Sequence, residues 1–223
     1  MFVSRLILDP RCRRVRAEML NPYEMHRTLQ RAFEGDRVEA GMLYRVDVDR
    51  ATGVPTVIVQ SQADPRWDFL AQLPRYVLDT GEPNPEHKPF IPVFSAGQLL
   101  HFRLRANPAR KLSNRRIGNR NGVRVGLYTE DEQLAWLARK GEEGGFRLLS
   151  CHVVPEGKVY GKKTSPETLD EEGRPTKHEM QHFAVRFDGV LQVTDPEALL
   201  GTLRCGIGPA KAFGFGLLSL ARV

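Results

Sequence analysis

The amino-acid sequence predicts an α+β protein in which one order of elements, β-α-β-β-α-β, occurs twice. Three observations support this fold class. Short segments in which apolar and polar residues alternate are typical of strands. Segments with apolar residues three and four positions apart follow good helix-capping residues. A stretch rich in Pro and Gly, at 81–98, separates two halves that each show this order and predicts a linker.

The first half begins with a strand and a helix. Asn21 is a favourable N-cap residue, and Pro22 suits the first helical position because that position needs no backbone N–H. Two alternating segments joined by "RATGV" predict a hairpin. In chain order, we expect a strand at 2–8, a helix at 22–34, strands at 42–49 and 55–61, a short helix at 64–73 and a strand at 75–80.

The second half repeats the order. Thr129 and Glu132 form the pattern of a capping box, and Asp195 and Gly206 suit the two ends of a last helix. The polar stretch 155–181, between the two central strands, predicts a loop with a mobile tip. In chain order, we expect a strand at 99–107, a helix at 129–140, strands at 145–154 and 182–194, a helix at 195–206 and a strand at 215–223.

Both halves match the ferredoxin-like pattern of elements. A chain of 223 residues is long enough for two domains of roughly 100 residues each. We therefore expect two tandem ferredoxin-like domains, one at 1–90 and one at 95–223.

The positive charge is concentrated in the middle of the chain. The net charge is +6 and the sequence pI is about 9.4. From His87 to Thr129 there is no Asp or Glu, and the rest of the chain has a net charge of about −3. Such a concentrated excess favours a polyanion such as nucleic acid, although a solvated basic face is the alternative. The nine cations of this stretch are Lys88, Arg103, Arg105, Arg110, Lys111, Arg115, Arg116, Arg120 and Arg124.

The sequence lacks the marks of a membrane protein or a disulfide-rich protein. No apolar run approaches the ~20 residues that a membrane-spanning helix needs. Arg5 interrupts the apolar N-terminal stretch, which lacks the order of a signal peptide. Cys12, Cys151 and Cys205 are far apart and indicate neither a disulfide framework nor a zinc site. We therefore expect no cofactor, no metal, no membrane contact and a cytoplasmic location.

The predicted helix at 22–34 has an apolar face and a polar face. At about 100° per residue, one side collects the residues that we expect to be buried, Met25, Leu29 and Ala32. The almost opposite side collects Tyr23, His26, Arg27 and Gln30. Because Tyr23 and His26 are three residues apart, their side chains can approach each other.

These residue types suit the cleavage of RNA without a metal ion. In that reaction the 2′-OH attacks its adjacent phosphate, one group takes the 2′ proton, and another protonates the 5′-O leaving group. Histidine side chains titrate near neutrality and a phenol can exchange a proton. Arginine offers phosphate a fork of donors that stabilises the developing charge. Ordinary amphipathicity of a surface helix is the alternative interpretation.

Glycines gather before the last expected strand, in "GIGPAKAFGFG" at 206–216. Residues without Cβ can present backbone N–H groups to phosphates, with Lys211 beside them. The segment is not a Walker motif, because GK[ST] is absent. A helix C-cap followed by a bulged entry into a strand is an equally good account. The glycines are Gly206, Gly208, Gly214 and Gly216.

Two basic segments could also contact a nucleic acid. "FRLRANPARKLSNRRIGNRNGVR" at 102–124 could follow phosphates beside a strand. "GKVYGKK" at 157–163 could be a hairpin that enters a groove, with Tyr160 available to stack on a base. Either segment could instead be a solvated loop.

Taken together, four segments resemble a known family. "NPYEMHRTL", "FRLRANPAR", "AWLARK" and "GIGPAKAFGFGLLSL" are similar, in this order and over nearly the whole chain, to the CRISPR repeat-processing endoribonucleases of the type I-E system (CasE/Cse3). The resemblance implies two RRM-like domains that bind the CRISPR repeat hairpin and cut at its 3′ base by 2′-OH attack, without a metal. It also implies retention of the mature guide RNA and assembly into the Cascade complex. A non-catalytic RNA-binding scaffold subunit is the alternative.

The resemblance also implies site residues. The catalytic histidine falls on His26, and the helical tyrosine of some members falls on Tyr23. An assisting basic residue falls on Arg31, where arginine would stabilise charge rather than donate a proton. The glycine-rich loop would support the structure and contact RNA. The expected RNA-binding residues are Arg27, Arg103, Arg105, Arg110, Lys111, Arg115, Arg116, Arg120, Lys158, Lys162, Lys163 and Lys211.

Overall fold

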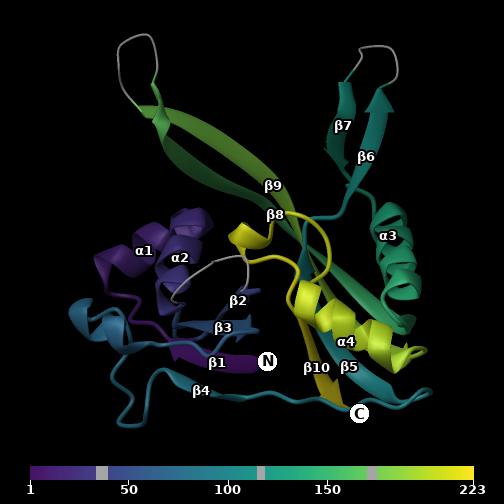
Figure 1. Ribbon diagram of the computed structural model, residues 1–223, viewed down its shortest axis with the longest axis horizontal. Helices are drawn as coiled ribbons and strands as arrows, with labels where there is room; N and C mark the ends of the chain where they lie inside the picture. Colours follow the sequence, from purple (N-terminus) through teal and green to yellow (C-terminus); the bar gives the residue numbers. More distant parts are fainter. Residues whose placement is uncertain (34–39, 115–118, 170–174) are drawn as a thin grey trace. The chain divides into compact units, whose positions relative to one another are not determined.

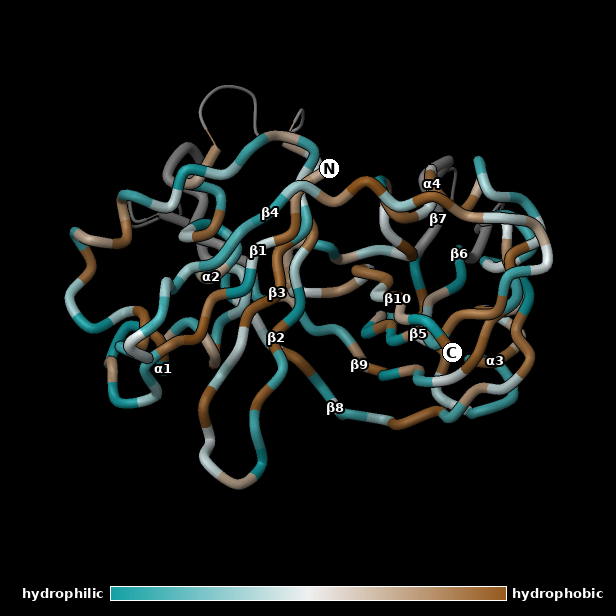
Figure 2. Tube along the Cα trace, turned by 90° about the horizontal axis from the view of Figure 1, so that it is seen from below, coloured by the Kyte–Doolittle hydropathy of each residue, from teal (hydrophilic) through white to brown (hydrophobic). Residues whose placement is uncertain are grey.

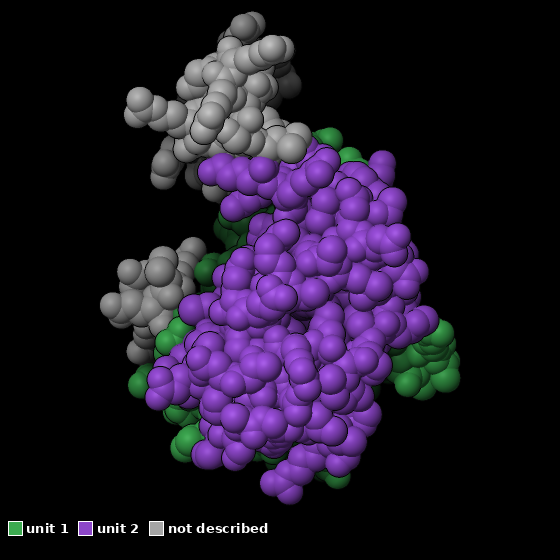
Figure 3. All heavy atoms as spheres, turned by 90° about the vertical axis from the view of Figure 1, so that its right-hand side faces the viewer, with its two compact units in different colours: residues 1–91, 159–181, 212–214 green, residues 92–158, 182–211, 215–223 purple. Residues whose placement is uncertain are grey.

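The computed structural model of the protein describes residues 1–33, 40–114, 119–169 and 175–223. Its contacts divide the chain into two compact units (Figure 3). Unit 1 comprises Met1–Ile91, Val159–Gln181 and Ala212–Gly214. Unit 2 comprises Pro92–Lys158, His182–Lys211 and Phe215–Val223. Each unit therefore draws residues from separate parts of the chain.

Unit 1 contains a four-stranded antiparallel sheet (Figure 1). Its strands are β1 (Phe2–Ile7), β2 (Leu43–Val48), β3 (Pro55–Ser61) and β4 (Glu86–Pro89). They lie in the order β2-β3-β1-β4, with β1 paired to β3 on one side and to β4 on the other. This is the order that two interleaved β-α-β units produce, so the predicted ferredoxin-like arrangement is confirmed for this unit.

The edge strand beside β1 is not at 75–80, where the sequence predicts the fourth strand. In that segment Val77 forms an isolated bridge with Leu8, and the edge strand is β4 instead. Arg75 has a φ of 59°, a left-handed conformation that interrupts an extended chain. The predicted linker at 81–98 therefore contributes a strand to the sheet.

The helices of unit 1 also differ in extent from the prediction. α1 (Arg13–Leu20) is a helix that the sequence pattern does not predict. α2 spans Pro22–Leu29 and continues as the 3-10 helix η1 (Gln30–Ala32), so the predicted helix is present but its α-helical part ends early. The predicted helix at 64–73 is a 3-10 helix, η2 (Asp68–Gln72).

α1 escapes detection because one of its buried residues is a carboxylate rather than an apolar side chain. Glu18, 4% exposed, accepts hydrogen bonds from Arg14 Nε (2.7 Å), Thr28 Oγ1 (2.6 Å) and the Tyr76 hydroxyl (2.5 Å). These bonds satisfy a charge that would be costly to bury alone, and they join α1 to α2. Burial, together with the charge of Glu18, raises the pKa of the Tyr76 phenol, which keeps its proton and donates it.

The predicted apolar face of α2 is buried. Met25, Leu29 and Ala32 are at most 1% exposed and belong to one hydrophobic cluster with Leu6 of β1 and Val57 of β3. Leu6 and Val57 are also cross-strand partners. Hydrophobic and hydrophilic segments follow one another along the β2–β3 hairpin (Figure 2). In β3 the buried Val57 and Val59 alternate with the half-buried Thr56 and Ile58, as expected for a strand that buries one face.

Unit 2 contains a second four-stranded sheet, in the order β10-β5-β9-β8. Its strands are β5 (Leu99–Ala106), β8 (Phe146–Leu169), β9 (Pro175–Val193) and β10 (Leu218–Arg222). Its α-helices are α3 (Glu130–Glu143) and α4 (Pro196–Cys205). The strand order is again the ferredoxin-like one, so the fold class is confirmed for both units.

The predicted helix caps of unit 2 are confirmed. The Thr129 side chain accepts a hydrogen bond from the backbone N–H of Glu132, and the Asp195 side chain accepts bonds from the first turn of α4. These bonds satisfy N–H groups that have no partner within the helix. Beneath α3, Trp136 and Phe187 stack with their ring centroids 6.2 Å apart.

Two hairpins differ from the sequence prediction. β6 (Ala109–Asn114) and β7 (Asn119–Gly126) form a two-stranded ribbon where the sequence suggests a basic loop (Figure 1). β8 and β9 extend far beyond their sheet, so most of the loop predicted at 155–181 is strand. Each strand supplies backbone partners to the other, which stabilises polar strands without a local apolar pattern.

Candidate active site and nucleic-acid interface

Tyr23 and His26 lie together on α2, as the helical spacing predicts. Their ring centroids are 6.3 Å apart, and both side chains are half-buried. The imidazole stacks on the ring of Tyr44, at a centroid distance of 6.2 Å and an angle of 22°. Tyr44 is fully buried, so the imidazole rests on a fixed surface. The Nδ1 atom of His26 is buried as well.

Tyr44 is itself fixed by two carbonyl groups. Its hydroxyl lies 2.7 Å from the carbonyl oxygen of Pro22, to which it donates, and 3.3 Å from that of Ala212. The first bond joins β2 to the start of α2, and the second contact joins it to the glycine-rich loop. Tyr44 is not predicted as a site residue, because a tyrosine in an alternating strand carries no signal that links it to a distant histidine.

The glycine-rich loop covers this part of α2. The Phe213 ring lies 6.1 Å from that of Tyr23. Gly214 has a φ of +75°, and a Cβ there would lie 3.1 Å from the ring of Tyr44. A glycine therefore allows the loop backbone to approach the tyrosine that supports His26. Phe213, like Tyr44, is a functional candidate that the sequence pattern does not predict.

Residues of the β8–β9 hairpin contact the start of α2. The Asn21 side chain accepts a bond from the backbone N–H of Lys162 (3.2 Å) and donates one to its carbonyl (3.3 Å). A Cβ on Gly161 would lie 2.3 Å from Phe213 Cε1. Asn21 is the N-cap residue of α2, as predicted, but its side chain makes no capping bond to the helix and its amide group bonds Lys162 instead.

The two arginines of this helix have different surroundings. Arg27 is exposed and forms an ion pair with Glu24, with 3.1 Å between Nη1 and Oε2. The guanidinium carbon of Arg31 lies 4.5 Å above the centroid of the Phe69 ring. The structure thus brings Tyr23 and His26 together and places Arg31 over an aromatic ring.

Several predicted RNA-binding cations have carboxylate partners within the protein. Arg103 Nε lies 2.6 Å from Asp188, and Arg105 Nε lies 2.6 Å from Glu156. Arg186 also contacts Asp188, at 2.8 Å. Burial alone would raise the pKa of Asp188, but the bonds and charges of Arg103 and Arg186 lower it below its usual 3.8. Because Arg103 and Asp188 are cross-strand partners, this network lies on one face of the sheet.

The other predicted cations lie on the two hairpins. Arg110 and Lys111 are exposed on β6, and Lys158 is exposed on β8. Lys162 pairs with Glu179 at 2.9 Å, a hydrogen bond and charge interaction that raise the pKa of this lysine. The backbones of Arg120 and Lys163 lie in β7 and β8, but their side chains fall outside the described part of the structure, and Arg115 and Arg116 fall wholly outside it.

The glycines of 206–216 take up the conformations that glycine favours. All four have positive φ, and Gly206 ends α4 by donating its N–H to Thr202. Gly216 donates to the carbonyl of Arg105 and accepts from Ile207. This confirms the C-cap that the sequence suggests for Gly206. Lys211 begins the 3-10 helix η3 (Lys211–Phe213) and is half-buried.

Among the described residues, no group of three or more His, Cys, Asp or Glu could hold a metal ion. No helix in the described part of the chain has the length and apolar character to cross a membrane.

Comparison with known proteins gives matches along the chain. The model of the family described as "CRISPR associated protein" matches residues 1–222. The CRISPR-associated endoribonuclease Cse3 of Thermus thermophilus is 41% identical over 223 residues, which cover 99% of this chain and 100% of that protein. The CRISPR system Cascade subunit CasE of Escherichia coli K12 is 38% identical over 130 residues, 56% of this chain and 59% of that protein.

A solved structure has the same fold. Thermus thermophilus Cse3 bound to an RNA representing a pre-cleavage complex has a TM-score of 0.76 and 38% identity, over 99% of this chain and 98% of that one. The resemblance inferred from the sequence motifs is therefore confirmed over the full length. The chain belongs to the CRISPR associated protein family, in the group that contains Cse3 and CasE.

Proposed function

We propose that the protein is an endoribonuclease that binds the hairpin of the CRISPR repeat transcript and cuts at its 3′ base. The observation that carries this proposal is the Tyr23–His26 pair on α2, with the imidazole stacked on Tyr44. The 41% identity to an endoribonuclease over the whole chain supports it. The pair combines two side chains that can exchange protons, held at a distance that a ribose and its phosphate can bridge.

The reaction needs two proton transfers and no metal. The 2′-OH of the nucleotide before the cut attacks the adjacent phosphorus, and its proton passes to one member of the pair. The bond to the 5′-oxygen breaks, and that oxygen takes a proton from the other member. The products are a 2′,3′-cyclic phosphate, or the 3′-phosphate formed from it, and a 5′-OH end. Arg31, in the role of a fixed charge, would stabilise the phosphorane.

Binding of the repeat RNA would depend on the basic residues of the β6–β7 and β8–β9 hairpins of the protein and on the glycine-rich loop. The first domain, 1–90, would carry the catalytic helix, and the second, 95–223, would carry these loops. One relative bears the name Cascade subunit, so we infer that this chain keeps the mature guide RNA and joins a Cascade complex in the cytoplasm.

Substitution of the imidazole tests the proposal. His26→Ala should slow single-turnover cleavage of the cognate repeat hairpin by about 10²–10⁴-fold, the usual contribution of one acid–base group, and leave hairpin affinity within about twofold. His101→Ala removes an exposed histidine from β5 and is the matched control. EDTA should not change the wild-type rate, and a 2′-deoxy nucleotide before the cut should abolish cleavage.

Two outcomes would contradict the proposal. Cleavage that stops in EDTA would indicate a metal-dependent reaction. Tight binding of the hairpin by the wild-type protein without any cleavage would instead support the non-catalytic scaffold subunit.

A further inference from the structure

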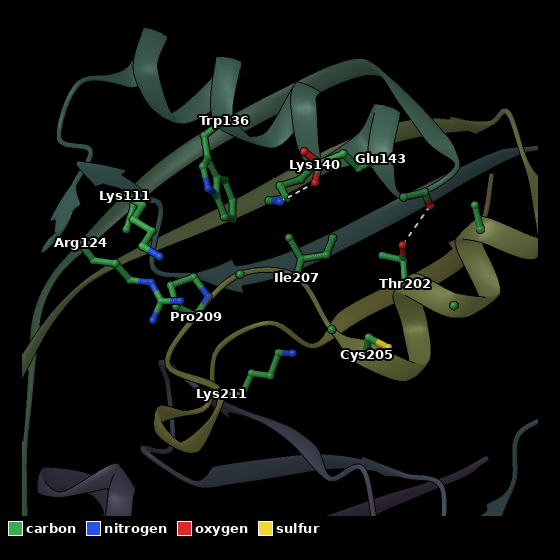
Figure 4. Close-up of a pocket in the computed structure, with 16 residues that line it drawn as sticks. Lys111, Arg124, Trp136, Lys140, Glu143, Thr202, Cys205, Ile207, Pro209 and Lys211 are labelled. Carbon is green, nitrogen blue, oxygen red and sulfur yellow. Dashed lines mark hydrogen bonds and ion pairs between the residues drawn. The ribbon is translucent and has the colours of Figure 1, made fainter. Parts of the chain in front are cut away.

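A pocket of about 630 Å³ opens in unit 2 beside the glycine-rich loop (Figure 4). Its walls come from the base of the β6–β7 hairpin, from α3, from α4 and from the loop itself. The volume lies in the usual range for small-ligand sites and is sufficient for one nucleotide. All of its lining residues belong to unit 2, so the pocket shares no residue with the Tyr23–His26 pair.

Four cations line this pocket. Lys111, Arg124, Lys140 and Lys211 come from β6, β7, α3 and η3, and among the described lining residues Glu143 alone is acidic. Lys140 is paired with Glu143, with 2.5 Å between Nζ and Oε2. None of the ion pairs formed by the described residues involves the other three cations. Three positive charges are therefore available to an anion, and the side chains of Lys111 and Arg124 extend from the hairpin toward the pocket (Figure 4).

The register of the hairpin provides independent support for a bound anion. Lys111 and Arg124 are direct cross-strand partners. Two like charges in such positions repel each other and weaken the pairing of the strands. An anion held between them replaces this repulsion with attraction. The repulsion between Lys111 and Arg124 therefore favours a bound anion, whatever the shape of the pocket.

Apolar residues in the rest of the lining are Trp136 and Ile207, both almost fully buried, and Pro209, which is half-buried. Thr202 and Cys205 also line this side of the pocket. Gly208 has a φ of +83°, and a Cβ there would lie 3.0 Å from Trp136 Cζ2, so the loop backbone packs directly against the indole. A ligand that complements the whole pocket has an anionic group at one end and a flat, weakly polar part at the other.

We propose that the pocket binds one unpaired nucleotide of an RNA strand that flanks the hairpin. Lys111, Arg124 and Lys211 bind its phosphate, and its base lies on the apolar residues of the lining. Bases inside a duplex are paired and stacked and cannot enter a concave pocket, whereas an unpaired base is free to do so. This inference rests on the proposed function, because it takes the substrate to be RNA.

The test compares two RNAs, each made uncleavable by a 2′-deoxy nucleotide before the cut. One is the bare hairpin and the other carries its single-stranded flanks. The wild-type protein should bind the flanked RNA about tenfold more tightly, the usual contribution of one stacked base with its phosphate. In the variant that combines Lys111→Gln and Lys211→Gln, most of this advantage should disappear.

A matched control removes one charge from the same unit. Arg204→Gln lies at an exposed position near the end of α4 and outside the pocket lining, so it should keep the tenfold advantage. Thermal unfolding reports whether each variant is folded. Lys111→Gln alone changes an exposed side chain and keeps the test possible if the combined variant does not fold.

Three results would overturn the inference. The first is equal affinity of the wild-type protein for the flanked RNA and the bare hairpin. The second is an equal loss of affinity for both RNAs in the combined variant, which would mean that the cations contact the stem. Saturable binding of AMP alone at micromolar concentration, with no effect of the flanks, would identify a free-nucleotide site. Cleavage of unmodified RNA by the wild-type protein separates these results from a failure of the proposed function, in which the hairpin is neither bound nor cut.

Discussion

Two groups of basic residues in unit 2 show how differently similar side chains can be used. On the face of the sheet, Arg103 lies 2.6 Å from Asp188 and Arg105 lies 2.6 Å from Glu156. Around the pocket, Lys111 and Arg124 face each other across a two-stranded ribbon. The first group is neutralised by its own protein, and the second group lacks such partners among the described residues. Both groups look alike in the sequence, because the carboxylates that distinguish them are distant along the chain.

The difference teaches that a count of positive charges overstates the surface that is ready to bind RNA. An arginine that already holds a carboxylate must give up that pair before it can bind a phosphate at full strength. A cation without such a partner loses little on binding and releases counterions from the RNA. We therefore expect the paired arginines to contribute to stability and the pocket cations to contribute to affinity.

Of the effects that distinguish the two groups of cations, the largest should be the loss of stability on removal of the carboxylate of Asp188. Asp188→Ala leaves Arg103 and Arg186 beside each other without their common partner, so we expect the free energy of unfolding to fall by about 1–2 kcal/mol. Urea denaturation measures this change. Glu142→Ala, at an exposed position on α3, is the control and should change it by less than about 0.5 kcal/mol. Equal changes in both variants would mean that the network contributes no stability.

An intermediate effect should appear in RNA binding. Lys111→Gln should weaken binding of an uncleavable flanked hairpin by roughly three- to tenfold, whereas Arg103→Gln should weaken it by less than about twofold. Fluorescence anisotropy at several salt concentrations measures both, and the slope of affinity against salt should become shallower in Lys111→Gln. If Arg103→Gln has the larger effect, its ion pair opens when RNA binds and the two groups do not differ as proposed.

The smallest effect should be a change in acid sensitivity. The pKa of Asp188 is below its ordinary value in the folded protein, so the unfolded chain binds its proton first as the pH falls. The stability that Asp188 provides is therefore present above about pH 4 and is lost as the pH falls through its folded pKa. Urea midpoints between pH 3 and 6 should decline less steeply in Asp188→Asn than in the wild-type protein. Parallel curves for the two proteins would contradict the assignment.

Local pattern predicts much of the fold. The strands of the unit 2 sheet and the ends of α3 and α4 follow from alternation, helical spacing and capping residues such as Thr129 and Asp195. In unit 1 the same patterns predict every strand except β4. The elements that local pattern does not predict are stabilised by residues that are distant along the chain. α1 contains the buried Glu18, which is tolerated because of Thr28 and Tyr76. The hairpins beyond the sheet are polar strands, and only the facing strand reveals their structure.

The candidate active site divides in the same way. The approach of Tyr23 to His26 follows from spacing along one helix. Tyr44, which stacks against the imidazole, comes from β2. Phe213, which packs against Tyr23, comes from the glycine-rich loop near the end of the chain. No periodic pattern in the sequence relates such positions, so three-dimensional information was needed to find them.

The discontinuous composition of unit 1 limits how the protein can be taken apart. A fragment that stopped at Ile91 would retain both Tyr23 and His26, yet it would lack Gly161 and Phe213, which pack at the start of α2. The shortest piece that could reproduce the complete surroundings of the imidazole is therefore almost the entire polypeptide. Exchange of parts between relatives would have to carry the helix, the long hairpin and the C-terminal loop together.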